Sequence, residues 1–194
     1  MKKTVAPTRD RILKAAKHLF QQRGYFAVGT AEILEAADAP KGSMYHHFPD
    51  GKEQIAIEAV TAIRDDVLSL MQRYANEQRS VADSIRSLAR GMSSWLKDSA
   101  WREGTMLATT TVGSVPDLPK LHAAIKDAFD AWRTQIVSQL VDEGWARHSA
   151  RAMAQFILSG IEGAMIVARI DQNERAVIDV ANSLAEVLDA KTIS

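Results

Sequence analysis

Residues 30–48 read TAEILEAADAPKGSMYHHF, two short segments with helical patterning on either side of a turn. The segments cover residues 30–37 and 41–47, and the Asp-Ala-Pro sequence at 38–40 is typical of a tight turn. Four apolar side chains in these segments can face a third helix: Ile33, Leu34, Ala37 and Met44. The stretch therefore predicts two short helices that need a supporting helix to complete a core.

The supporting helix is predicted immediately upstream. Its apolar stripe consists of Ile12, Leu13, Ala16, Leu19 and Phe20. We predict that Thr8 caps the N-terminus of this helix and that Gly24 ends it. A support helix followed by two short helices across a tight turn is the layout of a helix-turn-helix, which places its last helix on DNA.

Polar side chains of the second short helix suit contact with DNA. Lys41 and Gly42 open the helix, where the backbone can approach a phosphate closely and the helix N-terminus favours an anion. Ser43 and Tyr45 carry hydroxyl groups that can donate to phosphate oxygens, and Lys52 adds a positive charge just beyond. The sequence therefore predicts that this helix presents a DNA-binding face.

His46 and His47 could instead suggest a metal site. Adjacent side chains on a helix point about 100° apart, which does not favour a shared ion. We therefore predict no metal ligands in this protein. His46 is the better candidate for DNA contact, and His47 is expected to pack against the support helix or to bond to backbone.

Charge is unevenly distributed along the chain, although the formal net charge is zero. Residues 1–52 hold 9 lysines and arginines against 5 acidic residues, whereas residues 53–194 hold 15 against 19. A basic N-terminal part on an acidic remainder can direct one end of the protein toward phosphate, which is consistent with a DNA partner.

Helical periodicity continues through the rest of the chain, and no stretch alternates like a strand. Six further helices are predicted near residues 52–74, 81–95, 103–112, 121–140, 150–170 and 177–188. Prolines and a glycine between 113 and 119 break the third of these, and Gly144 ends the fourth. The predicted fold is all-α, with a three-helix head over residues 1–51 and a six-helix body over residues 52–194.

The predicted helix at 150–170 is apolar on more than one side. It also carries four small residues that let another helix approach closely: Gly160, Gly163, Ala164 and Ala168. One interpretation is a central core helix of the body. The other is that this helix and the one at 177–188 build a four-helix interface with a second copy of the chain. The first interpretation does not exclude the second.

Composition excludes several classes of protein. The chain has no cysteine, which excludes disulfides and thiolate metal sites and fits a reducing cytoplasm. We expect neither a signal peptide nor a membrane partner, because the charge-free stretches are shorter than the ~18 apolar residues of a span. The common motifs of hydrolases, metalloproteases and nucleotide-binding enzymes are missing, so we predict no catalytic residues and no cofactor.

Residues 8–60 resemble the DNA-binding head of the TetR family of repressors. The matching residues are Ile12-Leu13, Ala16, Leu19-Phe20, Gly24-Tyr25 and, above all, the run KGSMYHHFPDGKE at 41–53. The resemblance implies that Thr30 touches a phosphate at the start of the second helix and that Lys52 clamps another. It also implies a DNA face on the recognition helix formed by Lys41, Ser43, Tyr45 and His46.

The body resembles the LmrA/YxaF-like branch of this family over residues 124–133 and 160–169. That branch represses drug-efflux or catabolic genes until a small aromatic ligand binds, so the resemblance implies an aromatic or hydrophobic effector. The sequence departs from the family pattern at two places. Asp38 and Ala39 stand where a glycine and a bulky aliphatic residue are usual, and Arg-Glu-Gly-Thr at 102–105 replaces a Gly-Cys-Pro sequence.

Aromatic, thioether and polar side chains of the body are the candidates for effector contact. They are Trp95, Trp101, Met106, Thr110, Phe129, Trp132, Phe156, Glu162 and Met165. As a set they resemble the lining of an apolar pocket, in which flexible methionines adapt to varied ligands. Each of them could equally fill the core, and Glu162 could simply pair with an arginine.

These features predict a dimeric repressor that responds to a small molecule. Two recognition helices would enter successive major grooves of a palindromic operator, ~34–36 Å apart. Effector bound in the body would move the helix that begins at Lys52 and so release the DNA. The alternatives are an activator, a nonspecific DNA binder, and a helical small-molecule-binding protein without operator-specific DNA binding.

Overall fold

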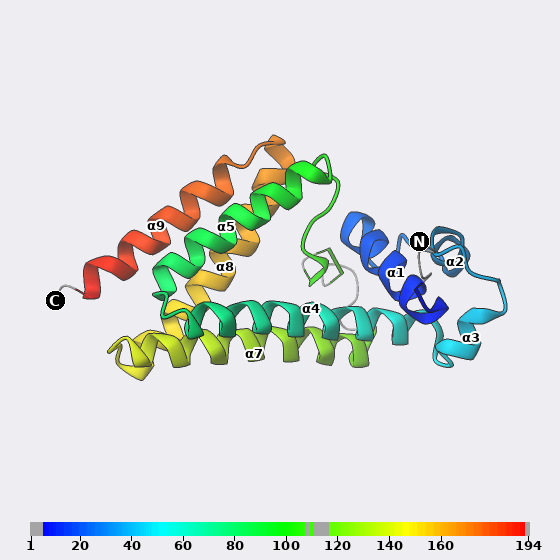
Figure 1. Cartoon of the computed structure of the whole chain (residues 1–194), viewed down its shortest axis with the longest axis horizontal. Helices are drawn as coiled ribbons and strands as arrows, with labels where there is room; N and C mark the ends of the chain where they lie inside the picture. Colours follow the sequence, from blue (N-terminus) through cyan, green and yellow to red (C-terminus); the bar gives the residue numbers. More distant parts are fainter. Residues whose placement is uncertain (1–5, 108, 111–116, 193–194) are drawn as a thin grey trace, which may run out of the picture. The chain divides into compact units, whose positions relative to one another are not determined.

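The computed structural model describes residues 6–107, 109–110 and 117–192, and all regular structure in these ranges is helical (Figure 1). The helices are α1 (Thr8–Arg23), α2 (Thr30–Ala36), α3 (Ser43–His47), α4 (Gly51–Asn76), α5 (Val81–Asp98), α7 (Pro119–Asp142), α8 (Arg147–Asp171) and α9 (Arg175–Thr192). Residues 106–107 and 109–110 are also helical. The predicted all-α fold is therefore confirmed.

The chain divides into two compact units. Unit 1 comprises residues 1–63 and 105–127, and unit 2 comprises residues 64–104 and 128–194. Helices α4 and α7 each contribute to both units, because the unit boundaries fall inside them. These units do not coincide with a division between residues 51 and 52, and the predicted division into head and body stays a prediction.

In unit 1 the apolar stripe of α1 packs against the two short helices as the sequence predicts. Phe20 of α1, Ile33 of α2 and Met44 of α3 are buried, as is Phe48 directly after α3. Full burial of one such side chain stabilises the folded state by roughly 1.5–3 kcal/mol. The predicted N-cap is wrong by one residue, since α1 begins at Thr8 itself and Pro7 occupies the cap position.

The turn between α2 and α3 contains a residue in the left-handed conformation. Asp38 has a φ of 47°, a region that glycine adopts freely and that aspartate tolerates better than most residues. The carboxylate of Asp38 also lies 3.7 Å from the guanidinium of Arg11 on α1. This conformation explains why a glycine is usual at this position, and Asp38 satisfies the same backbone requirement.

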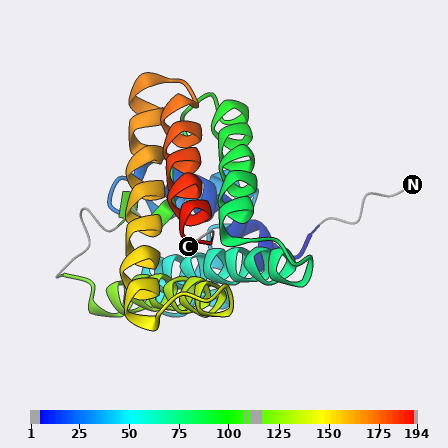
Figure 2. The same ribbon diagram turned by 90° about the vertical axis from the view of Figure 1, so that its left-hand side faces the viewer.

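In unit 2, α9 lies between α5 and α8, and the three helices run side by side (Figure 2). Their shared core includes Leu96 of α5, Met165 of α8 and Leu184 of α9. Gly160 lets α8 and α9 approach closely, since a Cβ built there would lie 3.5 Å from side-chain atoms of Val180 and Leu184. The core-helix interpretation of the 150–170 segment is therefore confirmed.

Helix α8 also carries apolar side chains on its outer surface. By length and composition alone it could cross a membrane, a property that it shares with core helices of soluble proteins. One face of α8 packs into the core through seven buried residues: Ala150, Ala154, Ile157, Ile161, Ala164, Met165 and Ala168. The exposed apolar residues lie on the other face and include Phe156, Ile166, Val167 and Ile170.

The segment between α5 and residue 106 is not helical, which corrects the predicted helix start at Glu103. Ala100 and Trp101 both have positive φ values, 51° and 62°. The carboxylate of Glu103 is buried and accepts a hydrogen bond from Trp95 Nε1 at 2.6 Å. Residues 102–105 thus form a bridging segment, and helix begins at Met106. The predicted end of this helix near residue 112 lies outside the described residues.

Candidate nucleic-acid interface and effector residues

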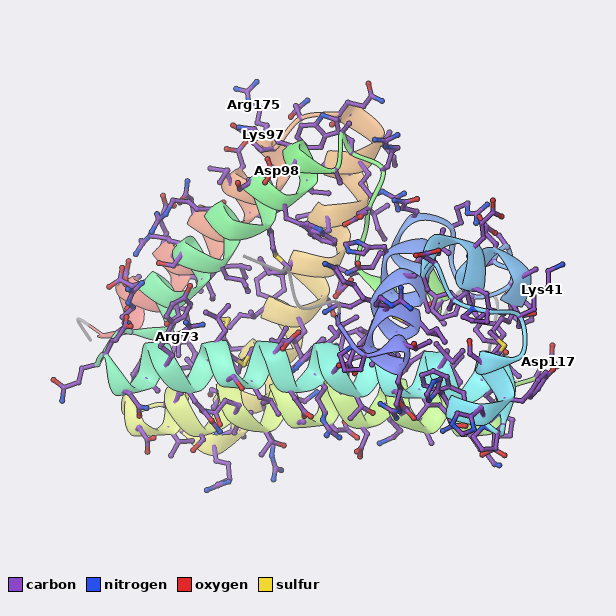
Figure 3. The ribbon with its side chains drawn as sticks, turned by 45° about the vertical axis from the view of Figure 1, so that its right-hand side comes forward. Lys41, Arg73, Lys97, Asp98, Asp117 and Arg175 are labelled. Carbon is purple, nitrogen blue, oxygen red and sulfur yellow. The ribbon has the colours of Figure 1, made fainter. Side chains whose placement is uncertain are left out.

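Helix α3 is amphipathic in the manner that the DNA-binding prediction requires. Met44 is buried against the support helix, whereas Tyr45 on the next position is 69% exposed. Lys41, Gly42 and His46 are also exposed, and Figure 3 shows Lys41 projecting from the ribbon between α2 and α3. These exposed positions lie on the recognition helix or directly before it.

Two further predicted contacts differ in what they can offer to a phosphate. Thr30 is exposed at the first position of α2, where the backbone N–H groups of the helix are unpaired. The Ser43 hydroxyl donates to the carbonyl oxygen of Pro40 at 2.6 Å. The proton of Ser43 is therefore used in the turn, so this side chain can accept a hydrogen bond but is not the phosphate donor that was predicted.

Lys52, at the second position of α4, makes contacts inside unit 1. Its Nζ donates to the carbonyl oxygens of Tyr25 at 3.1 Å and of Val28 at 3.0 Å. It also lies 4.0 Å from the centroid of the Tyr25 ring, a cation–π distance. Burial lowers the pKa of Lys52 from its usual value. These contacts hold the loop between α1 and α2 and use two of the three ammonium protons, so the phosphate-clamp role of Lys52 stays a prediction.

Ion pairs that the sequence did not predict fix α1 in unit 1. Arg9 donates to the carboxylate of Glu58 on α4 at 2.6 Å, and its guanidinium lies 5.0 Å from the Phe48 ring centroid. At the other end of α1, Arg23 pairs with Glu32 of α2. No short spacing connects these residues in sequence, so only an assembled helix-turn-helix could have revealed them. They orient the support helix relative to α2 and α4.

His46 and His47 pack edge to face, with ring centroids 4.8 Å apart. His46 is exposed and His47 is half-buried. This agrees with His46 as the DNA-facing member of the pair. Within the described ranges, no group of three or more histidine and acidic side chains is arranged to hold a metal ion.

Two of the predicted effector residues meet on α7. The rings of Phe129 and Trp132 lie 5.5 Å apart at 69°, an edge-to-face arrangement. Trp132 is 5% exposed, and its Nε1 donates to the carbonyl oxygen of Arg64 on α4 at 3.1 Å. Helix α4 and this aromatic pair are thus joined directly within unit 2.

Five other candidates of unit 2 take different positions. Trp95, Trp101 and Met165 belong to or pack against the core of α5, α8 and α9. Glu162 is half-buried on α8. Phe156 does not join the others, because its side chain is 57% exposed on the outer face of α8. Its predicted place in a pocket lining is therefore corrected: periodicity identified an apolar residue but not the face on which it lies.

The remaining two candidates, Met106 and Thr110, lie in unit 1. Both are about 1% exposed. The Thr110 hydroxyl has no hydrogen-bond partner among the described residues. A buried hydroxyl without a partner is unfavourable by about 1–3 kcal/mol. This group is therefore suited to bind a polar atom of a small molecule.

Comparisons with known proteins agree over most of the chain. Residues 81–183 match the family described as "Transcriptional regulator LmrA/YxaF-like, C-terminal domain", and residues 12–59 match "Bacterial regulatory proteins, tetR family". The chain is 28% identical to the HTH-type transcriptional regulator YxaF of Bacillus subtilis over 184 residues, covering 95% of this chain and 96% of that protein. It is also 28% identical to LmrA of the same organism over 185 residues, covering 93% and 96%.

A solved structure has the same fold. The TetR transcriptional regulator from Legionella pneumophila superposes with a TM-score of 0.85 at 21% sequence identity, over 95% of this chain and 99% of that one. At this identity the likeness concerns the fold alone. The helix-turn-helix over the first part of the chain and the helical remainder thus recur together in a single known architecture.

Proposed function

We propose that this chain, which belongs to the TetR family of bacterial regulatory proteins and has an LmrA/YxaF-like C-terminal domain, is a DNA-binding transcriptional repressor. It acts as a homodimer that a small apolar effector releases from a palindromic operator. The observation that carries the DNA-binding part is the amphipathic recognition helix α3. Its polar face is exposed while Met44, between Ser43 and Tyr45, is buried.

The DNA-facing groups are assigned different tasks in this proposal. Thr30 and Gly42 bring the backbone close to phosphates, and Lys41 supplies positive charge. Tyr45 and His46 lie along α3, where they can reach base edges in the major groove. The Ser43 proton is used in the turn before α3, whereas Lys52 keeps a third ammonium proton for a phosphate beyond its two bonds within unit 1.

The exposed apolar face of α8 supports the proposed dimer. Phe156, Val167 and Ile170 are exposed, as is Val187 on the neighbouring α9. Gly163 lies in open space on the same face, where a partner helix could approach closely. An apolar face of this kind is unusual for a monomer and fits a four-helix interface with a second copy of the chain.

Each unit contains its own candidate for effector contact, a polar group in unit 1 and an aromatic pair in unit 2. Thr110 offers an unpartnered hydroxyl in unit 1, and Trp132 lies against Phe129 and is bonded to α4 in unit 2. Because α4 is continuous from Gly51 to Asn76, a shift of this helix near Arg64 reaches its start beside α3. The effector must favour the released state; a full switch from 1:99 to 99:1 requires about 5.5 kcal/mol of differential affinity.

Fluorescence anisotropy tests the proposal directly. The purified protein is titrated onto DNA from its own upstream region and onto a scrambled sequence, over a series of salt concentrations. Specific binding tighter by ~10³ or more, and weakening as salt rises, is expected of an operator-reading repressor. Equal and weak binding to both would favour a helical small-molecule-binding protein instead. A reporter gene downstream of that region distinguishes a repressor from an activator.

A further inference from the structure

The end of α1 lies in direct backbone contact with Thr109, in the helical residues 106–107 and 109–110. Gly24 terminates α1 with φ 75° and ψ 173°, and its N–H donates to the Phe20 carbonyl oxygen at 2.8 Å. A Cβ built on Gly24 would lie 2.5 Å from the carbonyl oxygen of Thr109. No other residue fits here without moving one backbone away from the other. Thr109, which lies 85 positions after Gly24 in the chain, thus contacts the C-terminal end of the support helix.

Thr109 also bonds to α1 through its side chain. Its hydroxyl lies 3.0 Å from the carbonyl oxygen of Phe20, 3.1 Å from that of Thr105 and 3.2 Å from that of Met106. A hydroxyl has one proton, so it donates to one of these oxygens at a time. A bond to the Phe20 oxygen joins Thr109 to α1, whereas a bond to the Thr105 or Met106 oxygen stays within the segment that contains Thr109.

Release of α1 leaves none of these groups without a partner. If the Thr109 proton turns to Thr105 or Met106, the hydroxyl stays bonded, and the Phe20 oxygen keeps the Gly24 N–H. Release of α1 therefore costs no more than the ~1 kcal/mol of one hydrogen bond, because no buried group is left unpaired. A contact of this kind can be made and broken by a small displacement.

Two neighbouring features connect this contact with regulation. Thr110, with its unpartnered buried hydroxyl, directly follows Thr109, and adjacent helical side chains point about 100° apart. Because Thr109 and Thr110 are adjacent in the chain, a displacement of the backbone at Thr110 is shared by Thr109. At the same end of α1, Arg23 pairs with Glu32 of α2, so a displaced α1 carries the helix-turn-helix with it.

We propose that Thr109 is a positioning residue for operator binding. Its bond to Phe20 holds α1, and through α1 the recognition helix, in the DNA-competent arrangement. When the effector contacts Thr110, the Thr109 hydroxyl donates to the carbonyl oxygen of Thr105 or Met106 instead of Phe20, and α1 is freed. This inference rests on the proposed function for its regulatory meaning, but the contact itself can be measured without DNA.

Three variants of the full-length protein test the role of the hydroxyl. T109V removes it and keeps the branched shape, while T109S restores it. T134V is the matched control, since Thr134 is exposed on α7 and its hydroxyl bonds only within its own helix, to Asp130. The measurements are hydrogen exchange of the last-turn amides of α1 and the affinity for DNA from the upstream region.

In T109V the rate of amide hydrogen exchange near Gly24 is expected to rise and the operator affinity to fall, each by about fivefold. This factor corresponds to the loss of one hydrogen bond of ~1 kcal/mol. T109S should restore both, and T134V should change neither. Exchange and affinity in T109V equal to those of the wild type would overturn the inference. If wild-type protein binds upstream and scrambled DNA alike, the proposed function fails, and exchange near Gly24 still decides whether Thr109 holds α1.

Discussion

At the scale of single residues, Lys52 has two candidate roles, support of the loop between α1 and α2 and contact with a phosphate. Its ammonium group is bonded to two carbonyl oxygens and lies over the Tyr25 ring. A residue that neutralises a phosphate contributes about −0.9 to the slope of log K against log salt, whereas one that supports a loop does not. The two roles are therefore separable by measurement.

For K52M we expect operator affinity to fall by about fivefold or more while the salt slope stays that of the wild type, because two internal hydrogen bonds are lost. Anisotropy titrations over a salt series measure both. K41M is the matched comparison, since Lys41 is exposed and its loss should make the slope shallower by about one charge. A shallower slope of log K against log salt in K52M would show that Lys52 contacts a phosphate.

Gly24 is a second residue whose identity is dictated by geometry. Its φ and ψ fall in a region essentially limited to glycine, and Thr109 leaves no room for a Cβ. We expect G24A to lower the free energy of unfolding by about 1–3 kcal/mol, measured by urea denaturation. G29A is the control, because a Cβ at Gly29 meets nothing within 4 Å and its φ is −88°. Equal effects in the two variants would contradict this explanation.

At the scale of helices, the N-terminus of α5 is capped from another helix. Ser80 accepts from the Asp83 N–H at 3.0 Å, and Glu143, just after α7, accepts from the Val81 N–H at 2.7 Å. Burial raises the pKa of Glu143; the Val81 N–H opposes this rise, and the charges of Asp189 and Asp83 add to it. The cap thus joins α5 to α7 at the expense of a partly desolvated carboxylate.

The sign of the pH effect follows from that raised pKa. Because Glu143 holds its proton more tightly in the folded state, its contribution to stability falls as pH rises from the unfolded-state pKa through the folded-state pKa. E143Q keeps the acceptor oxygen and removes the charge. Its melting temperature should exceed that of the wild type at about pH 7 and match it at about pH 4. A variant less stable than the wild type at about pH 7 would show that the charge itself stabilises the cap.

Helix patterns were predictable wherever one short segment contains the whole signal. The buried face of α2 and α3, the exposed positions of α3 and the end of α1 at Gly24 all follow from local spacing. The helix predicted from Glu103 failed because a distant partner decides that segment. Trp95 binds the Glu103 carboxylate, and Arg169 donates to the Arg102 carbonyl oxygen, contacts that no local pattern reveals.

The candidate site residues also fall into two groups, those that a local sequence pattern locates and those that depend on the folded structure. Tyr45 and His46 could be placed from the motif alone, whereas α8 carries apolar residues on both faces, and periodicity could not say which face is inward. Phe156 was assigned to the wrong one. Thr109 is not among the predicted site residues, because the α1 carbonyl oxygen that its hydroxyl reaches lies 89 residues away in the sequence.

At the scale of the whole molecule, the outer face of α8 is expected to determine the oligomeric state. V167E places a charge in the proposed interface, where burying it unpaired is strongly unfavourable. We expect this variant to elute as a monomer in size-exclusion chromatography with light scattering, while the wild type elutes as a dimer. S94E on the exposed surface of α5 is the control and should remain dimeric. If V167E still elutes as a dimer, the dimer interface does not include this face of α8.

The recognition helix is only five residues long, from Ser43 to His47, and this limits how much sequence one copy can recognise. A bacterial chromosome offers on the order of 10⁶–10⁷ competing positions, so the short DNA sequence that one recognition helix can distinguish occurs many times by chance. Because binding free energies of independent contacts add, two heads that each prefer their half-site by about 10³ prefer the full site by about 10⁶. Pairing of two copies therefore supplies the information needed to find one gene.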